Sequence, residues 1–190
     1  DLDRPIAELL AAVAERKGCA VRDVGVVVLD RERHMEQIGA MCEAGARVRL
    51  IPDGDVAGSL MAVRPGTGID LLWGVGGTPE GVLSASAIRS VGGRIIGRIW
   101  PRSDEERDAI VAAGIDPTRI LDTDDLVGSQ DTIFAASGVS DGDLVRGVRY
   151  HADGAEVSTL VLRGHCRTQR VIDTALVAGG RLSRIPQSGY

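Results

Sequence analysis

The sequence predicts an α/β fold in which parallel strands alternate with helices and an antiparallel hairpin follows near the end of the chain. Up to residue 136, short aliphatic and β-branched runs alternate with segments of helical spacing, which is the pattern of βαβ units. Polar or glycine-rich loops follow three consecutive predicted strands. In open α/β sheets ligands bind beyond the carboxyl ends of the strands, so these loops form the candidate site.

The first predicted elements follow one another with short polar breaks. In chain order they are a helix over Ile6–Arg16, a strand over Val24–Leu29, a helix over His34–Ala44, a strand over Arg47–Ile51, a helix over Val56–Val63 and a strand over Ile69–Trp73. The helices are predicted from apolar residues spaced three and four apart, with Gly18 and Gly45 as stop signals. The strands are predicted from short continuous aliphatic runs, which are typical of strands covered on both faces.

The middle of the chain continues this alternation after the glycine-rich turn Gly74–Thr78. Pro79 opens the next helix, because proline is favoured in the first helical turn, where its missing N–H costs nothing. A strand is then predicted over Arg94–Trp100, an exposed charged helix over Asp104–Ala113 and a buried strand over Thr132–Ala136.

The last part of the chain changes character. Strand-like segments over Leu144–His151 and Glu156–Arg163 flank Asp153–Gly154, a strong hairpin signal, so an antiparallel pair is expected. A closing helix is predicted over Thr168–Ala178, and Ser183–Tyr190 is expected to be a frayed end. No long polar linker divides the sequence, so residues 1–190 are expected to form a single domain.

Composition and charge argue against several classes of function. The net charge of -5 lacks the broad basic field that nucleic-acid binding requires. No apolar run approaches the roughly 18 to 20 residues of a membrane helix, so neither nucleic acid nor membrane is an expected partner. The three cysteines form no Cys-x-x-Cys pair and the three histidines lack zinc-site spacing, which favours a reduced, cytoplasmic setting.

The first candidate loop, after the strand ending at Leu29, carries Arg31 and Arg33 on either side of Glu32. These arginines have a plain alternative role, which is to solvate the start of a helix. However, guanidinium is the side chain best shaped for bidentate contact with phosphate, and a loop between strand and helix can direct two of them at one anion. The loop therefore suggests a small ligand that carries phosphate.

The second candidate loop contains Asp53, Gly54 and Asp55. An ordinary Asx turn and helix cap would explain these residues as well. In the functional interpretation the carboxylates accept hydrogen bonds from sugar hydroxyl groups, while Gly54 lets the backbone approach closely. This pattern fits the binding of a polyol.

The third candidate loop leads from Gly74 to Glu80 and is the most specific segment. Thr78 is expected to cap the helix, with Pro79 at its first position, so that unpaired amide groups face an anion. The glycine spacing departs from the dinucleotide-binding fingerprint. Glu80 in the first turn is either a favourable partner of the helix dipole or a ligand of a divalent metal.

The combination of these loops resembles class II, bacterial-type fructose-1,6-bisphosphatases. The matching segments, in order, are Leu29-Asp30-x-x-Arg33, Pro52–Ala57, Gly76–Val82 and Phe134–Val139. The resemblance implies a layered αβαβα sugar-phosphatase fold, of which this chain is the carboxy-terminal half. It also implies hydrolysis of the 1-phosphate of fructose 1,6-bisphosphate to fructose 6-phosphate in gluconeogenesis, with Mg²⁺ or Mn²⁺ as cofactor.

The resemblance assigns substrate-binding roles to Arg31, Glu32, Arg33, Asp53, Gly54, Asp55 and Gly77, and a metal-binding role to Glu80. It assigns no catalytic residue to this chain, because the remaining metal ligands and the groups that handle the attacking water belong to an amino-terminal half. The expected partners are fructose 1,6-bisphosphate, that missing half and further copies in a homo-oligomer. The alternative is a non-catalytic module that binds a sugar phosphate or nucleotide, since binding without turnover needs the same residues.

Overall fold

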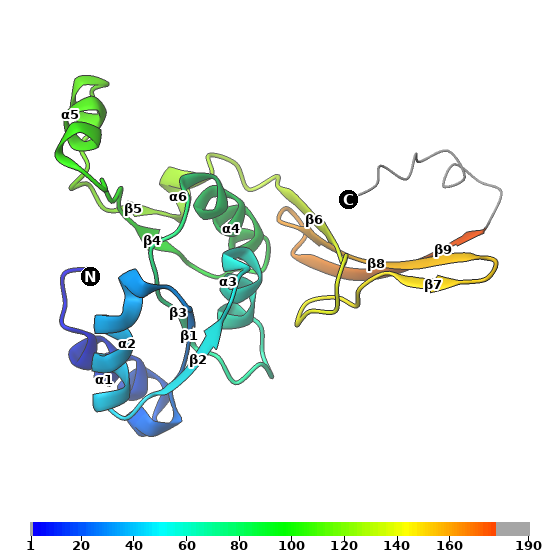
Figure 1. The fold of residues 1–190 in the computed structure, drawn as a ribbon, viewed down its shortest axis with the longest axis horizontal. Helices are drawn as coiled ribbons and strands as arrows, with labels where there is room; N and C mark the ends of the chain where they lie inside the picture. Colours follow the sequence, from blue (N-terminus) through cyan, green and yellow to red (C-terminus); the bar gives the residue numbers. More distant parts are fainter. Residues whose placement is uncertain (1, 178–190) are drawn as a thin grey trace.

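The structure is a computed structural model that describes residues 2–177. Its helices and strands are α1 (Ile6–Lys17), β1 (Gly25–Leu29), α2 (Met35–Glu43), β2 (Arg47–Ile51), α3 (Asp55–Val63), β3 (Leu71–Leu72), α4 (Thr78–Ser90), β4 (Ile96–Gly97), α5 (Asp104–Ala112), β5 (Leu121–Asp122), α6 (Thr123–Leu126), β6 (Ile133–Ser137), β7 (Arg149–His151), β8 (Gly154–Arg163) and β9 (Thr168–Val177). Short 3₁₀ turns over Val21–Asp23 and Glu32–His34 lie on either side of β1. The predicted α/β class with βαβ units and a C-terminal antiparallel hairpin is confirmed (Figure 1).

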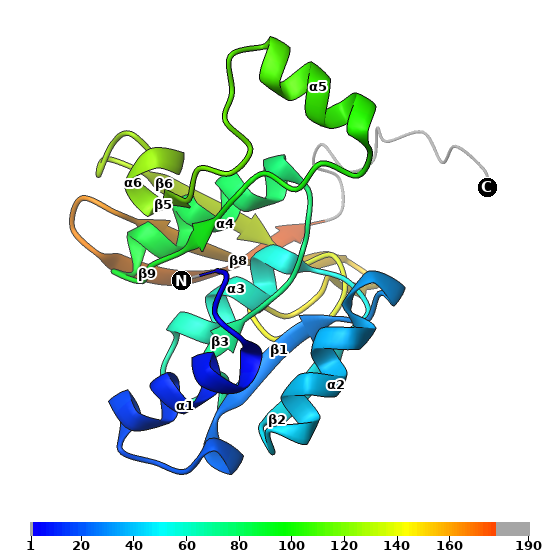
Figure 2. The same cartoon turned by 90° about the vertical axis from the view of Figure 1, so that its left-hand side faces the viewer.

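The first sheet is parallel, with strand order β2-β1-β3. Every residue of β1 is buried. Successive side chains of a strand point to opposite faces of the sheet, so both faces of β1 are covered. Val26 and Val28 join Leu10 of α1 and Met41 of α2 in one apolar cluster, and these two helices cover one side of the sheet (Figure 2). The predicted strand covered on both faces is therefore confirmed.

The opposite face of this sheet is covered by α3. Helix and sheet meet at Gly58, where an added Cβ would lie 3.1 Å from a methyl group of Leu72 and 3.2 Å from one of Ile51. Contacts this tight leave little room for a side chain, so the glycine permits the close approach of the helix. Because α3 is fixed in this way, its amino end is fixed beside the carboxyl end of β2.

A second, antiparallel sheet packs on the other side of the α3–α4 pair. β8 pairs with β6 and β7 along one edge and with β9 along the other. Leu60 of α3 and Ala87 of α4 form an apolar cluster with Phe134, Leu160 and Leu162 of this sheet. The described layers thus run from α1 and α2 through the parallel sheet and α3–α4 to the antiparallel sheet, in the order αβαβ (Figure 1).

The helix predicted over Thr168–Ala178 is wrong over its described part. Thr168–Val177 forms β9, which pairs with β8 through all ten of its residues, from Thr168 opposite Arg163 to Val177 opposite Gly154. Residues Val171, Ile172 and Thr174 are β-branched and suit a pleated strand. A preceding turn directs the chain back along β8, and this pairing decides between strand and helix. Ser183–Tyr190 lies outside the described residues.

Four other strand predictions also need correction. Of the strand predicted over Ile69–Trp73, only Leu71–Leu72 is a strand. Over Arg94–Trp100 only Ile96–Gly97 is a strand, and it pairs antiparallel with β5 rather than joining the parallel sheet. β6 is not buried throughout, since Phe134 faces the helices while Ile133, on the opposite face, is 66% exposed. β7 is limited to Arg149–His151, although its antiparallel pairing with β8 was predicted. Over residues 2–177, no helix has the length and apolar character needed to cross a membrane.

Candidate functional site

The three candidate loops meet at one edge of the parallel sheet. Because β1, β2 and β3 run in the same direction, their carboxyl ends lie together. The loop after β1 leads through a 3₁₀ turn into α2, the loop after β2 into α3, and the glycine-rich turn after β3 into α4. The amino ends of α3 and α4 therefore border the same region of the molecule as Arg31 and Arg33.

His34 joins the first loop to the glycine-rich turn. Its side chain is fully buried, and the Val75 N–H donates to its Nε2 at 2.9 Å. The ring proton consequently sits on Nδ1, which donates to the Leu29 carbonyl at 2.9 Å. The ring also meets Trp73 edge-on, with centroids 5.8 Å apart. No functional role was predicted for this histidine, because no spacing pattern in the sequence indicates one.

Arg33 holds the following peptide group of the glycine-rich turn. Its Nε and Nη2 donate to the Val75 carbonyl at 3.0 and 2.6 Å. The two peptide groups that flank the Val75 Cα are therefore both held, the first at its N–H by His34 and the second at its carbonyl by Arg33. The described contacts leave Nη1 of Arg33 without a hydrogen-bond partner, so this nitrogen remains able to donate to a ligand. Arg31 donates from Nη1 to the Asp30 carbonyl at 2.9 Å, and Glu32 is exposed.

The second loop reaches the glycine-rich turn through Asp55. A Cβ added to Gly76 would overlap Oδ2 of Asp55, so the absence of a side chain at Gly76 admits this carboxylate. Asp53 accepts a hydrogen bond from the Gly54 N–H at 2.8 Å. Gly54 precedes α3 with φ +97°, a left-handed conformation that favours glycine, and no side chain caps this helix.

The third loop places Glu80 over Gly77. Gly77 occupies the N-cap position of α4, Thr78 is already helical, and no side chain caps the helix, so the expected capping role of Thr78 is wrong. The first amide groups of α4 consequently have no side-chain acceptor, as required of an anion-binding helix end. A Cβ on Gly77 would overlap Oε2 of Glu80, so this glycine makes room for an exposed carboxylate.

Glu80 is the candidate metal ligand at this edge of the sheet. Hard divalent cations prefer carboxylate oxygens and take six or more ligands. Glu80 offers such oxygens beside the glycine-rich turn. Within residues 2–177, however, no group of three or more His, Cys, Asp or Glu side chains is arranged to hold a metal ion.

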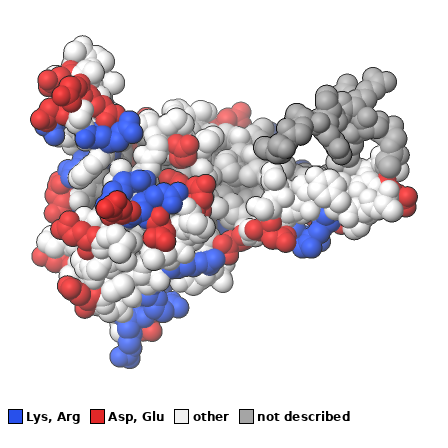
Figure 3. All heavy atoms as spheres, in the orientation of Figure 1, with Lys and Arg blue, Asp and Glu red and all other residues white. Residues whose placement is uncertain are grey.

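The surface charge agrees with small-ligand binding. In the face shown in Figure 3, basic and acidic side chains are interspersed and do not form one continuous basic field. At this sheet edge, arginine side chains and unpaired amide N–H groups can bind phosphate, and carboxylates can bind hydroxyl groups or a divalent cation.

Comparison with known proteins identifies relatives along nearly the whole chain. Residues 1–176 match the family described as bacterial fructose-1,6-bisphosphatase, glpX-encoded. A D-fructose 1,6-bisphosphatase class 2/sedoheptulose 1,7-bisphosphatase from Synechococcus sp. (strain JA-3-3Ab) is 40% identical over 96% of this chain. A fructose-1,6-bisphosphatase class 2 from Haemophilus influenzae is 37% identical over 92% of it. The chain spans 56% of the length of each of these two relatives.

Proposed function

The chain belongs to the bacterial, glpX-encoded fructose-1,6-bisphosphatase family, and from this premise we propose that it supplies the sugar-phosphate contacts of a fructose-1,6-bisphosphatase. The complete enzyme would hydrolyse the 1-phosphate of fructose 1,6-bisphosphate to fructose 6-phosphate in the cytoplasm, as a step of gluconeogenesis. The observation that carries the proposal is the convergence of three loops, joined through Val75 and Gly76, at the carboxyl edge of the parallel sheet.

The proposed roles of the side chains follow from their donors and acceptors. Arg33 has donors left over after binding Val75, and with Arg31 it would contact a substrate phosphate, with Glu32 between them. Asp53 and Asp55, flanking Gly54, would accept hydrogen bonds from sugar hydroxyl groups. Gly77, which has no side chain, would let the substrate approach the backbone.

Glu80 would hold Mg²⁺ or Mn²⁺ together with ligands from the part of the enzyme outside this chain. When bound, such an ion polarises the phosphoryl group and lowers the pKa of the attacking water. Within this chain Glu80 contributes a negative charge and an oxygen donor at the rim of the substrate region. No general base or nucleophile is proposed among residues 1–190.

We propose further that the rest of the enzyme covers the open face of the antiparallel sheet. Ile133 of β6 and Ile172 of β9 are 66% and 45% exposed, and both lie on the face opposite the α3–α4 pair. An added helical layer would bury them and extend the described αβαβ order to αβαβα. Assembly into a homo-oligomer is a separate expectation for the complete enzyme.

Removing the Arg33 side chain tests the substrate role of the first loop. In the complete enzyme, Arg33→Ala is expected to weaken substrate binding by about 1.5 to 3 kcal/mol, the contribution of charge-assisted hydrogen bonds, which is roughly a 10- to 150-fold rise in KM. Arg33→Lys should recover only part of this, because an ammonium group cannot reproduce the guanidinium fork. The measurement is KM for fructose 1,6-bisphosphate, with folding checked by circular dichroism.

Arg22→Ala is the matched control for Arg33→Ala. Arg22 is exposed and lies in the 3₁₀ turn before β1, at the opposite edge of the sheet from the candidate site. Its removal should leave KM unchanged. If Arg33→Ala folds normally and its KM is unchanged, the substrate role is wrong and Arg33 only binds the Val75 carbonyl.

The contact between Gly76 and Asp55 gives a second test of the same site. Alanine at position 76 would displace the Asp55 carboxylate, which is the movable end of its side chain, so the main expected effect is on substrate binding. KM should rise about tenfold or more, while the free energy of unfolding changes by no more than about 1 kcal/mol.

The control for Gly76→Ala is Gly39→Ala. Gly39 lies in α2, where an added Cβ meets nothing within 4 Å, so alanine should stabilise the helix by about 0.5 to 1 kcal/mol and leave KM alone. If Gly76→Ala binds substrate with a normal KM, the position of the Asp55 carboxylate beside Gly76 is not required for substrate binding.

A further inference from the structure

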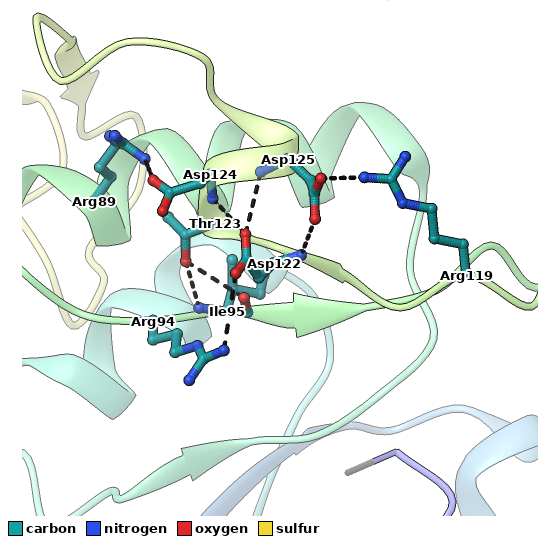
Figure 4. Close-up of polar contacts among 8 residues, drawn as sticks. All are labelled: Arg89, Arg94, Ile95, Arg119, Asp122, Thr123, Asp124 and Asp125. Carbon is teal, nitrogen blue, oxygen red and sulfur yellow. Dashed lines mark hydrogen bonds and ion pairs between the residues drawn. The ribbon is translucent and has the colours of Figure 1, made fainter.

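A separate cavity of about 320 Å³ lies at the far end of α4 from the candidate site. It is bounded by the end of α4, the segment before β4, α6 and the turn between β8 and β9. Figure 4 shows four of its charged lining residues, Arg89, Arg94, Asp122 and Asp124. Glu80 lies in the first turn of α4 and Arg89 in the last. A helix of this length spans about 20 Å, so the cavity is distinct from the region around Gly77.

Three arginines from different parts of the fold line this cavity: Arg89 from α4, Arg94 from the segment before β4, and Arg167 from the turn between β8 and β9. Two carboxylates, Asp122 and Asp124, line it as well. The formal charge of the lining therefore has an excess of one positive unit. What the cavity can bind depends on which of these charges are already engaged.

Arg167 has no hydrogen-bond or ion-pair partner for its side chain among the described residues. Its backbone has φ +48°, the one non-glycine residue with positive φ in the described chain. This left-handed conformation disfavours residues with a Cβ. The guanidinium lies over Gly92, where an added Cβ would be 3.6 Å from Nη1. The strained turn thus directs an unneutralised cation to the cavity.

The two carboxylates are occupied by other groups. Asp124 pairs with Arg89 (Figure 4). Asp122 caps α6 by accepting from the Asp124 and Asp125 N–H groups at 2.8 and 3.2 Å. Its other oxygen is 3.8 Å from Nη2 of Arg94, too long for a hydrogen bond. Because such an exposed pair is weak, the donors of Arg94 remain available to a ligand.

Arg89 adds a buried donor to this lining. Its side chain is 15% exposed, and its Nε is buried without a hydrogen-bond partner in the described structure. A buried unpartnered donor is costly, and a ligand or a water molecule that reaches it would remove that cost. The lining therefore contains one unsatisfied nitrogen of Arg89, which otherwise pairs with Asp124, and the unpaired guanidinium of Arg167.

We propose that this cavity is a second anion site, which binds the phosphate group of a small molecule. Guanidinium groups match phosphate geometry and charge, and Arg94 and Arg167 both line the cavity, so one anion there could contact both. The volume lies at the lower end of the range for small-molecule pockets. The site does not depend on the role proposed for Arg33.

Titration of the ¹⁵N-labelled 190-residue chain with inorganic phosphate tests this site. Sodium chloride of equal ionic strength serves as the reference, because salt alone weakens exposed charge interactions. We expect saturable shifts of the amide resonances of Gly92, Gly93 and Gly164. In Arg167→Ala and in Arg94→Ala the affinity at these resonances should fall about tenfold or more, and Arg167→Lys should retain part of it.

Two controls separate this site from the sheet edge and from general charge. Arg33→Ala should leave the shifts at Gly92 and Gly164 unchanged, and any phosphate shifts at Gly76 and Gly77 should persist in Arg167→Ala. Arg107→Ala removes an exposed arginine that pairs with Asp104 on α5 and should have no effect. The proposal is overturned if the three pocket glycines show no saturable shift, or if Arg167→Ala binds phosphate as the unmodified chain does.

Discussion

Replacing Glu80 by glutamine is expected to reduce kcat of the complete enzyme about a hundredfold or more. Glutamine keeps the shape of the side chain and removes the charge that a divalent cation needs from its ligand. If the bound ion stabilises the transition state by several kcal/mol, loss of a ligand should cost orders of magnitude in rate. Activity should return only at much higher Mg²⁺ or Mn²⁺ concentrations. The measurement is initial rate against metal concentration at saturating substrate.

A helix-start glutamate without a metal role would behave differently. Its interaction with the helix dipole contributes about 0.3 to 1 kcal/mol to stability and nothing to catalysis. Glu105→Gln provides this comparison, since Glu105 lies in the first turn of α5, a helix with no buried residue that projects from the body of the molecule (Figure 1). Both variants should melt within a few degrees of the unmodified protein without metal. If Glu80→Gln keeps near-normal activity and metal dependence, Glu80 is not a metal ligand, and this chain contributes only substrate contacts.

The sequence predicted the parallel sheet more successfully than the remainder of the chain. Arg47–Ile51 was predicted with the bounds that the structure shows, and Val24–Leu29 within one residue. Short aliphatic runs followed by polar loops have few other interpretations when helical segments flank them. Over Thr168–Val177 the apolar residues are compatible with either helix or strand. There the strand forms because the segment pairs with β8, and the spacing of residues in the sequence carries no information about that pairing.

The candidate site was predicted as a set of residues, but not as a set of contacts. Its three loops could be located in the sequence because each one directly follows a predicted strand. The bond between the Val75 amide and His34 joins residues 41 apart, and the Gly76–Asp55 contact likewise joins two different loops. Such contacts arise from the parallel arrangement of the strands. A single buried histidine has no sequence pattern that distinguishes a loop-bridging role from ordinary packing, so His34 was missed.

The 190-residue chain on its own is expected to release no measurable phosphate from fructose 1,6-bisphosphate. Phosphoryl transfer of the proposed kind needs bound metal ions, and a hard divalent cation needs several oxygen ligands. Glu80 is one proposed ligand, and among residues 2–177 no group of three or more His, Cys, Asp or Glu side chains is arranged to hold a metal ion. Substrate could still bind to the arginine and aspartate loops, because those contacts lie within the chain. Binding without turnover is therefore the expected behaviour.

Activity should appear when the rest of the enzyme is supplied, either as one longer polypeptide or as a separately purified partner. The measurement is metal-dependent phosphate release by the chain alone, by the partner alone and by the mixture, with intact mass confirming a 20.0 kDa species in the first sample. Glu80→Gln is the matched control, because activity from a contaminating phosphatase would be the same in both chains. Turnover by the pure 20.0 kDa chain that a chelator abolishes and Glu80→Gln removes would show that this chain assembles a working metal site by itself. The division of metal ligands between two parts of the enzyme would then be wrong.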